Sequence, residues 1–208
     1  MNNLLIVGAG GHGKVVSDAA FSMGCWDNIA FLDAKYPDLK EVIGYSVIGS
    51  VDQAVEFLKK YPSVVVAVGD NNIRMNLMDD LVGKGFSIPV IIHRSAWVSP
   101  SASLGEGSVV FANAVINASA QLGRGTVVNT SSIIEHDCCL GDGVHICPGV
   151  CMGGGVTIGN RSFIGVGSSI IHSVDLGVGV TVGAGAVVAG NIQSGFTVVG
   201  VPAKQIVK

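Results

Sequence analysis

One histidine in this sequence stands between two acidic residues, although acidic residues are scarce around it. His136 lies in the segment Ile134-Glu135-His136-Asp137. A carboxylate beside an imidazole can hold the ring in one tautomer and raise its basicity, which suits a general base. The alternative is a surface histidine beside solvated acids. We predict that His136 is a general base supported by a neighbouring carboxylate.

A glycine-rich segment near the start could bind phosphate. Gly8-Ala9-Gly10-Gly11-His12-Gly13 follows the apolar stretch Asn3–Val7, and Asp33 comes about twenty residues later, as in the dinucleotide-binding fingerprint. Its backbone N–H groups and the dipole of a following helix attract phosphate or carboxylate. We expect phosphate or nucleotide binding. The alternatives are a structural tight turn and a nicotinamide site, although about ninety residues leave little room for a nicotinamide enzyme.

The cysteines do not have the spacing of a metal site. Cys138, Cys139, Cys147 and Cys151 lack zinc-finger spacing, and we expect each to be a buried small residue. The chain also lacks the His-x-x-x-x-His pair of zinc-binding β-helix carbonic anhydrases. We therefore predict no metal. The odd number of five cysteines, without a C-x-x-C pair, favours reduced thiols and a cytoplasmic location.

Composition excludes several classes of protein. Of 208 residues, 49% are hydrophobic and 13% are charged, and the formal net charge is −3. These values exclude a disordered tail and a broad basic surface for nucleic acid. The mean hydropathy is +0.56, but no apolar run approaches the roughly 18–20 residues of a spanning helix, so we predict no membrane span. The first residues lack the charged region and cleavage site of a signal peptide.

A six-residue repeat runs through the second half of the chain. An aliphatic residue or Met recurs at every sixth position from Val98 to Val188, in sixteen consecutive steps, and a small or β-branched residue follows four places after each. Glycine often follows the aliphatic residue, as at Gly123 and Gly141, where we expect it to adopt turn conformations that a Cβ disfavours. Three such units close a triangular coil that stacks by parallel pairing. The pattern resembles the left-handed parallel β-helix.

Stacking places residues 18 apart one above another. Gly154 should therefore lie beside His136 and leave open space and accessible backbone for an acyl group. His172, two coils on, is expected to be structural. His145 lies half a coil from His136, so the two should face different sides of one subunit. If both serve one site, that site must lie between neighbouring subunits.

The first ninety residues instead alternate strands with helices, which predicts a small doubly wound α/β domain. An apparent capping box at Ser50-Val51-Asp52-Gln53 opens a helix to about Lys60, and Asp70 should cap another. The expected strands are Asn3–Val7, Ile29–Leu32, Val64–Val68 and Ile88–Ile91, and the other expected helices cover about 14–23 and Asn71–Val82. We expect a Rossmann-like parallel sheet over 1–94 and the β-helix over 95–208.

Three segments together resemble one protein family. Gly8 to Lys14, Asn129-Thr130-Ser131-Ser132-Ile133-Ile134-Glu135-His136-Asp137 and Gly200-Val201-Pro202-Ala203-Lys204 are similar to the sugar O- and N-acetyltransferases of the bacillosamine-pathway and sialic-acid type, within the hexapeptide-repeat acyltransferases. The resemblance covers essentially the whole chain. It implies acetyl transfer from acetyl-CoA to an amino or hydroxyl group of a nucleotide-linked sugar in glycan biosynthesis. It also implies a homotrimer with intersubunit sites.

The resemblance also implies roles for individual residues. His136 would deprotonate the acceptor, Asp137 would polarise His136, and Asn129 would help to place the acceptor. Some relatives have Glu at the position of Asp137. The remaining implied roles are contacts with acetyl-CoA by His145, the Gly154 backbone N–H and the main chain of Val166 and Ala184, and contacts with the sugar nucleotide by Gly10, Gly11, His12 and Asp33.

The leading prediction is an acetyltransferase that acts on the amino group of a nucleotide-linked 4-amino sugar, with uridine diphosphate as the expected nucleotide. Its closest alternative is O-acetylation of a sugar such as sialic acid, because the residues do not separate amine from hydroxyl acceptors. A nucleotide-binding trimeric scaffold without catalysis is a second alternative. A nicotinamide oxidoreductase is the third.

Overall fold

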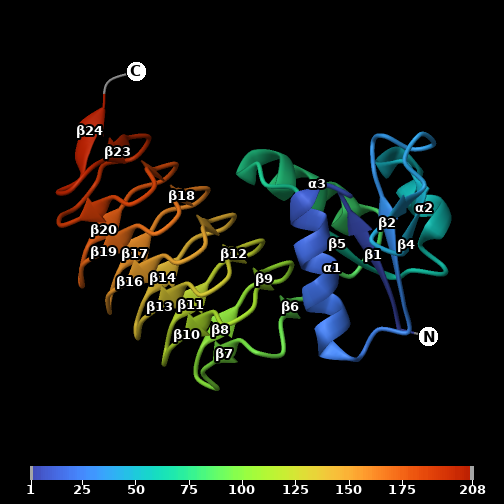
Figure 1. Ribbon diagram of the computed structural model, residues 1–208, viewed down its shortest axis with the longest axis horizontal. Coiled ribbons are helices and arrows are strands. Elements are labelled where there is room, and N and C mark those ends of the chain that lie inside the picture. The colour runs from blue at the N-terminus through green and yellow to red at the C-terminus, as the bar shows by residue number, and fades with distance from the viewer. Residues whose placement is uncertain (1, 207–208) are drawn as a thin grey trace. The chain divides into compact units, whose positions relative to one another are not determined.

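A computed structural model describes residues 2–206 of the chain. The chain forms two compact units, of which the first ends at Arg94 and the second begins at Ser95 (Figure 1). None of the helices in the described range has the length and apolar character needed to cross a membrane. Each unit is described separately below.

The first unit contains a mostly parallel five-stranded sheet. Its strands are β1 (Asn3–Val7), β2 (Asn28–Leu32), β3 (Glu41–Val42), β4 (Tyr45–Gly49) and β5 (Ser63–Val66), arranged in the order β3-β4-β2-β1-β5. The central strand β1 pairs in parallel with β2 on one side and with β5 on the other. All five residues of β1 are buried, as expected for a parallel strand covered on both faces.

Helices cover this sheet. They are α1 (Gly11–Met23), the 3-10 turn η1 (Val51–Gln53), α2 (Ala54–Phe57) and α3 (Asn71–Gly83). Met75, Met78 and Leu81 of α3 join the apolar core formed by alternate residues of β1, β2 and β5. The predicted cap of α3 is confirmed, because the Asp70 side chain accepts a 2.8 Å hydrogen bond from the Ile73 N–H.

The first unit differs from the sequence-based prediction at three places. The capping box at Ser50 is present, but the expected helix to Lys60 is reduced to η1 and α2, because Pro62 disfavours helical backbone just before it. The strand expected at Ile88–Ile91 is wrong. Pro89 has no N–H to donate, and β6 forms only at Ile91–Ile92.

The third difference is the β3–β4 hairpin, which the sequence analysis missed. Its two strands pair antiparallel around a tight turn at Ile43 and Gly44. Both residues have positive φ, +42° at Ile43 and +85° at Gly44. A β-branched residue is rare in that conformation, so the usual hairpin signal was absent from the sequence.

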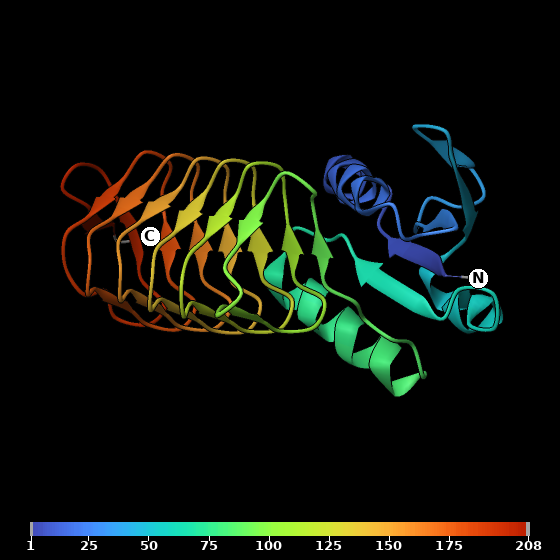
Figure 2. The same cartoon turned by 90° about the horizontal axis from the view of Figure 1, so that it is seen from below.

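The second unit is a left-handed parallel β-helix with sixteen two-residue strands, β7 to β22, and a closing hairpin (Figure 2). The strands are β7 (Trp97–Val98), β8 (Ser103–Leu104), β9 (Val109–Val110), β10 (Val115–Ile116), β11 (Gln121–Leu122), β12 (Val127–Val128), β13 (Ile133–Ile134), β14 (Cys139–Leu140), β15 (His145–Ile146), β16 (Cys151–Met152), β17 (Thr157–Ile158), β18 (Phe163–Ile164), β19 (Ser169–Ile170), β20 (Asp175–Leu176), β21 (Thr181–Val182), β22 (Val187–Val188), β23 (Thr197–Val199) and β24 (Lys204–Ile206).

The six-residue repeat has the predicted register. Each strand pairs in parallel with the strand three further along the chain, as when Ile116 pairs with Ile134. The strands therefore belong to three sheets, in which the first strands of the six-residue repeat are β7, β8 and β9. Ile134 and the small residues Ala114 and Ser132 are fully buried, which confirms that the two recurring positions fill the interior.

The glycines that follow the aliphatic residues are required for a different reason from the one expected. Gly123 and Gly141 do not have positive φ, whereas the glycines two places later in the same turns, Gly125 and Gly143, do. A Cβ at Gly123 would lie 2.6 Å from the backbone nitrogen of Asp142 in the next coil. Gly123 is therefore needed because two backbones approach closely.

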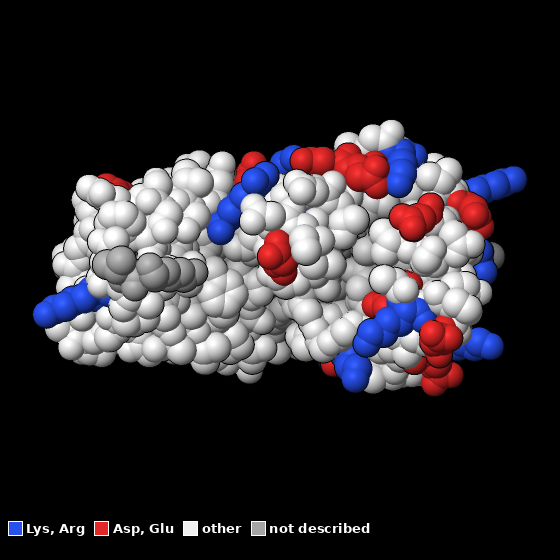
Figure 3. Space-filling model, turned by 90° about the horizontal axis from the view of Figure 1, so that it is seen from above, with Lys and Arg blue, Asp and Glu red and all other residues white. Residues whose placement is uncertain are grey.

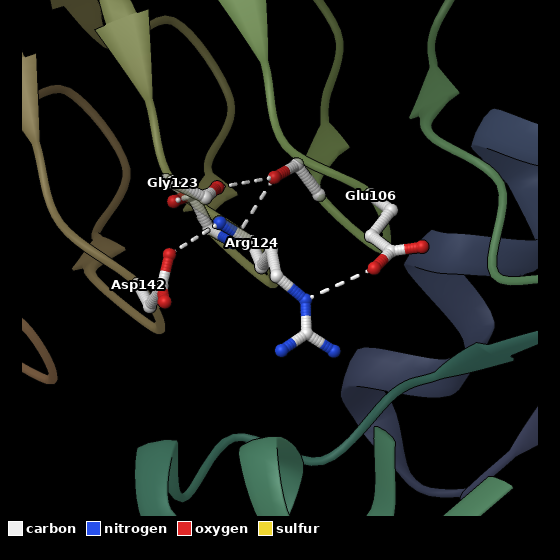
Figure 4. A network of polar contacts seen from close by, with 6 residues as sticks. Glu106, Gly123, Arg124 and Asp142 are labelled. Carbon is white, nitrogen blue, oxygen red and sulfur yellow. Dashed lines mark hydrogen bonds and ion pairs between the residues drawn. The ribbon is translucent and has the colours of Figure 1, made fainter. Parts of the chain in front are cut away.

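Polar side chains join successive coils along the same edge. The Asp142 carboxylate accepts a 2.8 Å hydrogen bond from the backbone N–H of Arg124, and the Arg124 side chain forms a 3.1 Å ion pair with Glu106 (Figure 4). The Asn160 side chain repeats this contact one coil further, accepting from the Asp142 N–H. These contacts hold the coils in register at an edge where the backbone turns.

Two cysteines are not buried as predicted. Cys138 and Cys147 are buried, but Cys139 and Cys151 are exposed. Cys139 and Cys151 are the first residues of β14 and β16, and the residue after each is the buried aliphatic or Met. Side chains alternate between the faces of a strand, so the residue before the interior position points outward.

The β-helix carries few charged side chains. Residues 95–208 contain far fewer Lys, Arg, Asp and Glu than residues 1–94, and Figure 3 shows large uncharged areas on one face of the β-helix. The unit is therefore stabilised mainly by its apolar interior and by backbone pairing between coils.

Candidate active site

His136 lies in the turn between β13 and β14 and is paired with its neighbour. Its Nδ1 lies 2.7 Å from a carboxylate oxygen of Asp137, and both side chains are exposed. A carboxylate can only accept a hydrogen bond, so Nδ1 carries the proton and Nε2 keeps a free lone pair. This is the arrangement that a neutral imidazole base requires.

The β-helix holds this pair in place. The backbone carbonyl of His136 accepts a 2.9 Å hydrogen bond from the Gly155 N–H of the next coil. Asp137 has φ of +61°, a left-handed conformation that Asp and Asn tolerate better than most residues. That conformation turns the chain sharply just after His136, and the carboxylate of Asp137 contacts the imidazole ring.

Gly154 lies directly against the His136 ring, as the 18-residue stacking predicts. A Cβ at Gly154 would lie 2.6 Å from both Cε1 and Nε2 of His136. Its N–H donates no hydrogen bond to any described residue, whereas its carbonyl accepts one from Ser173. The imidazole ring of His136 therefore packs against the backbone of Gly154 and itself fills the open space that the sequence predicted there, while the Gly154 N–H keeps no partner among the described residues.

Asn129 and His145 form a second group. The Asn129 Nδ2 lies 2.9 Å from the Ile146 carbonyl oxygen and 3.0 Å from Nε2 of His145. The carbonyl can only accept, which fixes the amide orientation, and the second Nδ2 hydrogen then points to His145. His145 is therefore neutral with Nε2 as acceptor, and its ring lies 5.1 Å from that of Phe163.

Val166 and Ala184 lie in later turns along the same edge as Asn129. The Val166 carbonyl accepts a 2.8 Å hydrogen bond from the Gly185 N–H, so the two turns are stacked. The N–H groups of Val166 and Ala184 donate to none of residues 2–206. Both residues are exposed. The edge therefore presents backbone donors that a ligand could use.

Within one chain, these two groups are separated. Asn129 lies in the turn before β13 and His136 in the turn after it, so one face of the prism stands between them. His145 and His136 face different sides, as predicted from their spacing. A shallow hollow on the sheet that contains β11, β14 and β17 includes none of the predicted site residues. The isolated chain thus presents two half-sites at opposite edges of one face.

The glycine-rich loop between β1 and α1 has two kinds of glycine. Gly8 has φ of +103°, and a Cβ at Gly13 would overlap the Gly8 carbonyl oxygen, so these two shape the turn. A Cβ at Gly10 or Gly11 would meet no atom of residues 2–206 within 4 Å. Helix α1 begins here with no side-chain cap. Its first N–H groups are therefore available to an anion.

Asp33 supports this loop. One of its carboxylate oxygens accepts a 2.7 Å hydrogen bond from the Ala9 N–H, and the other accepts a 2.9 Å hydrogen bond from the Lys35 N–H. In the dinucleotide fingerprint, the acidic residue at this position binds the ribose. Here each oxygen accepts one backbone N–H, so Asp33 fixes the loop, and each oxygen can still accept a second hydrogen bond. The predicted contact of Asp33 with the sugar nucleotide stays a prediction.

His12 and Arg74 lie close together in the first unit. Burial, followed by the positive charge of Arg74, lowers the pKa of His12 to about 4. Burial also lowers the pKa of Arg74 to about 10, which the charge of Asp70 partly opposes. The sequence analysis missed Arg74. No sequence motif marks it, and only the observed strand order, with β5 beside β1 at the switch point where ligands of α/β folds bind, brings it near His12.

In the part of the chain that the structure describes, no group of three or more His, Cys, Asp or Glu residues is arranged to hold a metal ion. Burial raises the pKa of Cys147 to about 11, and burial raises that of Cys138 as well. These two thiols therefore remain protonated in the interior at neutral pH, where they act as small apolar side chains.

Residues 3–81 match the family described as PglD N-terminal domain. The acetyltransferase domain of PglB from Neisseria gonorrhoeae, solved in complex with acetyl coenzyme A, is 43% identical over 99% of this chain and 100% of that chain, with a TM-score of 0.94. A variant of perosamine N-acetyltransferase from Caulobacter crescentus, in complex with CoA and GDP-perosamine, is 37% identical over 100% and 98%, with a TM-score of 0.94.

A curated relative extends the comparison. UDP-N-acetylbacillosamine N-acetyltransferase of Bacillus subtilis is 36% identical over 115 residues, which are 54% of this chain and 52% of that protein. The match thus spans about half the length of this curated relative. The two solved structures, in contrast, match over almost their full length. The chain therefore belongs to the hexapeptide-repeat family of sugar acetyltransferases that these proteins represent.

Proposed function

We propose that the protein transfers an acetyl group from acetyl-CoA to the amino group of a nucleotide-linked 4-amino sugar. The observation that carries the proposal is the His136–Asp137 pair, whose imidazole ring packs against the backbone of Gly154. The relatives support an amine over a hydroxyl acceptor, because two of the three are named as N-acetyltransferases of a sugar. The product would serve glycan biosynthesis in the cytoplasm, where acetyl-CoA and reduced thiols are available.

His136 provides the base that this reaction needs. An ammonium has no lone pair, and the amine must lose a proton as its nitrogen bonds to the acetyl carbon. Nε2 of His136 accepts that proton while Asp137 holds Nδ1–H and stabilises the imidazolium. When the C–S bond breaks, the same proton can pass to the departing thiolate. A positioned base of this kind typically contributes about 10²–10⁴-fold in rate.

The backbone supplies the groups that hold the acyl donor. The Gly154 N–H, which donates to none of residues 2–206, is placed to stabilise the oxygen of the thioester as charge develops there. His145 would lie near the thioester, and the N–H groups of Val166 and Ala184 would bind the CoA chain. Asn129 orients His145 through its amide and thereby helps to shape the acceptor site.

The first unit would hold the sugar nucleotide. Gly10 and Gly11 leave room for close approach, and the uncapped start of α1 suits a diphosphate. His12 would contact the ligand, and Asp33 would hold the loop in shape. One relative is named for a UDP sugar and another binds a GDP sugar. We propose UDP as the first candidate and GDP as the second.

The site would be completed in a homotrimer. In the sheet that contains β13, most of the side chains that point outward are apolar. They include Trp97, which is 58% exposed, and Val115, Ile133 and Val187 of later strands in the same sheet. The outward row of the next sheet is polar and includes Gln121. Apolar surface of this kind is buried when subunits associate. Association through this face would bring the His136 edge of one subunit to the Asn129 edge of its neighbour.

The test is acetyl-CoA-dependent mass gain on a panel of UDP- and GDP-linked amino sugars, with matched hydroxyl sugars as controls. We expect acetylation of an amine and release of free CoA thiol. His136→Ala should lower turnover at least about a hundredfold, with little change in melting temperature because the side chain is exposed. The proposal is wrong if no amino sugar gains mass or if this variant keeps normal turnover.

A further inference from the structure

Arg74 is a charged residue buried in the first unit, where charged side chains are rarely found. It is only 1% exposed, and it lies in the first turn of α3, where the helix dipole is unfavourable to a cation. Burying a guanidinium is costly unless hydrogen bonds compensate for it. The contacts of Arg74 should therefore show what the residue does.

Three hydrogen bonds of Arg74 go to the segment that joins β5 to the first residue of α3. Nη1 lies 3.0 Å from the Val68 carbonyl oxygen and 3.3 Å from that of Gly69, and Nη2 lies 2.8 Å from the side-chain oxygen of Asn71. Each of these oxygens would repel a nearby anion. Arg74 directs them toward itself and fixes the conformation of the segment.

This segment lies beside the glycine-rich loop. β5 and β1 are neighbours in the sheet, and a Cβ at Gly8 would lie 2.8 Å from the carbonyl oxygen of Ala67. The starts of α1 and α3 therefore lie at the same edge of the sheet, on either side of its switch point. Arg74 is close enough to His12 for its charge to lower the pKa of that imidazole.

The arrangement favours an anionic ligand. The guanidinium of Arg74 lies near two helix N-termini, beside a His12 imidazole that is neutral at pH 7, and the Asp70 carboxylate, which caps α3 through Ile73, offsets only part of this positive charge. A group with two negative charges would be stabilised there. The diphosphate of a sugar nucleotide is such a group.

We propose that Arg74 is a positioning residue of the sugar-nucleotide site, which holds the β5–α3 segment as the second wall of the site and places a permanent positive charge behind His12 for the diphosphate. This inference rests on the proposed function, because it assumes that the first unit binds a sugar nucleotide. Arg74 itself is too buried to touch the ligand. Its effect should therefore depend on the phosphates and not on the base or the sugar.

A ligand-truncation experiment separates this role from a purely structural one. UDP and uridine (or GDP and guanosine, if the wild type prefers guanine) are compared for binding to the full-length protein, by calorimetry for the nucleotide and ligand-observed NMR for the nucleoside. Arg74→Gln should weaken diphosphate binding at least about tenfold and nucleoside binding less than about threefold. In turnover, KM for the sugar nucleotide should rise while KM for acetyl-CoA stays unchanged.

Two further variants complete the design. Arg74→Lys keeps the charge but not the forked donor, and we expect it to lose about threefold in diphosphate binding and nothing in nucleoside binding. Lys84→Gln is the matched control. It removes a positive charge from the exposed end of α3, where Lys84 pairs with Asp80, and it should leave both affinities unchanged.

The outcomes are distinct. Equal losses for diphosphate and nucleoside, or no loss, in Arg74→Gln overturn the role of Arg74 while leaving the proposed function intact. If Arg74→Gln does not fold, Arg74→Lys decides in the same way, because an unselective loss or no loss there also overturns the role. If the wild-type protein binds neither UDP nor GDP, the nucleotide part of the proposed function and the inference built on it both fail.

Discussion

At the scale of single residues, two histidines of one β-helix have opposite environments. His136 is exposed, its Nδ1 is paired with Asp137, and its Nε2 accepts no hydrogen bond from the described residues. His145 is 9% exposed, and its Nε2 accepts a hydrogen bond from Asn129. Only His136 can therefore take a proton from a substrate at Nε2. Residue type alone would not have distinguished the two.

Gly154→Ala should lower activity without damaging the fold. The new Cβ would meet only the ring of His136, an exposed side chain that can move aside. We expect turnover to fall at least about tenfold because the ring leaves its position, while the melting temperature changes by only a few degrees. Steady-state kinetics and thermal melting of the variant provide the check.

Gly190→Ala is the matched control, because a Cβ there would meet no described atom within 4 Å. It should behave as the wild type in both measurements. Normal turnover in Gly154→Ala would show that the space beside His136 is not used in the reaction.

The low pKa of His12 predicts a dependence of stability on pH. Its pKa is about 4 in the folded chain and 6.5 in the unfolded chain, so between these values the unfolded state binds more protons. The contribution of His12 to the free energy of unfolding is thus fully present above about pH 6.5, is lost as pH falls toward 4 and does not change further below that value. The loss between pH 7 and pH 5 should be at most about 2 kcal/mol.

Urea unfolding of the wild type and of His12→Gln at several pH values measures this term. The free energy of the wild type should fall more steeply than that of the variant between pH 6.5 and 4. Parallel curves would mean that His12 titrates normally in the folded protein.

At the scale of elements, the turns of the β-helix set the positions of the site residues. The 18-residue coil places Gly154 above His136, and an edge of stacked glycines lets the backbones of successive coils come close together. An insertion of even one residue between His136 and Gly154 would break the 18-residue spacing and separate the two residues. The regular spacing is therefore a functional requirement as well as a structural one.

Gly123→Ala tests the close approach of the coils. The Cβ would lie 2.5–2.6 Å from atoms of Gly141 and Asp142, including backbone that cannot move without disturbing the next coil. Overpacking of this kind typically costs about 1–3 kcal/mol. Thermal melting should show a clear decrease for Gly123→Ala and none for Gly190→Ala. If both variants melt like the wild type, the glycines are not required for packing.

The sequence predicted the β-helix almost residue by residue, because a strict period leaves no choice of register. It also predicted the stacking of Gly154 on His136 and the cap at Asp70. The sequence-based prediction failed at one turn and at two cysteines. The Ile43–Gly44 turn has a residue that rarely takes positive φ, and Cys139 and Cys151 are exposed because of their strand position.

The site was predicted less completely than the fold. The acidic residues on either side of His136 predicted it as the base, and the glycine-rich pattern predicted the loop that contains Gly10. Arg74 carried no motif, and only the strand order, with β5 beside β1, brings it near His12. The fingerprint did not predict that the Asp33 carboxylate also accepts the Ala9 and Lys35 N–H groups and so fixes the loop. Contacts between segments that are distant in sequence decided the positions of Arg74 and of the Asp33–Ala9 pair.

At the scale of the whole molecule, one chain carries both halves of the site but keeps them apart. The His136 half and the Asn129–His145 half lie on either side of β13. In the proposed homotrimer, a closed ring of three copies would join one edge of each chain to the other edge of the next, and three complete sites would arise. The proposed activity therefore belongs to the assembly and not to the single chain.

Complementation between variants tests this claim most directly. His136→Ala and His145→Ala chains are co-expressed with different tags, and acetyl transfer by the purified mixed assembly is compared with that of each variant alone. Each variant alone should be nearly inactive. In a random equal mixture, about a quarter of the interfaces carry both native histidines, so about a quarter of wild-type activity should return. Activity that never exceeds that of the better single variant would contradict a site shared between subunits with His136 as its base.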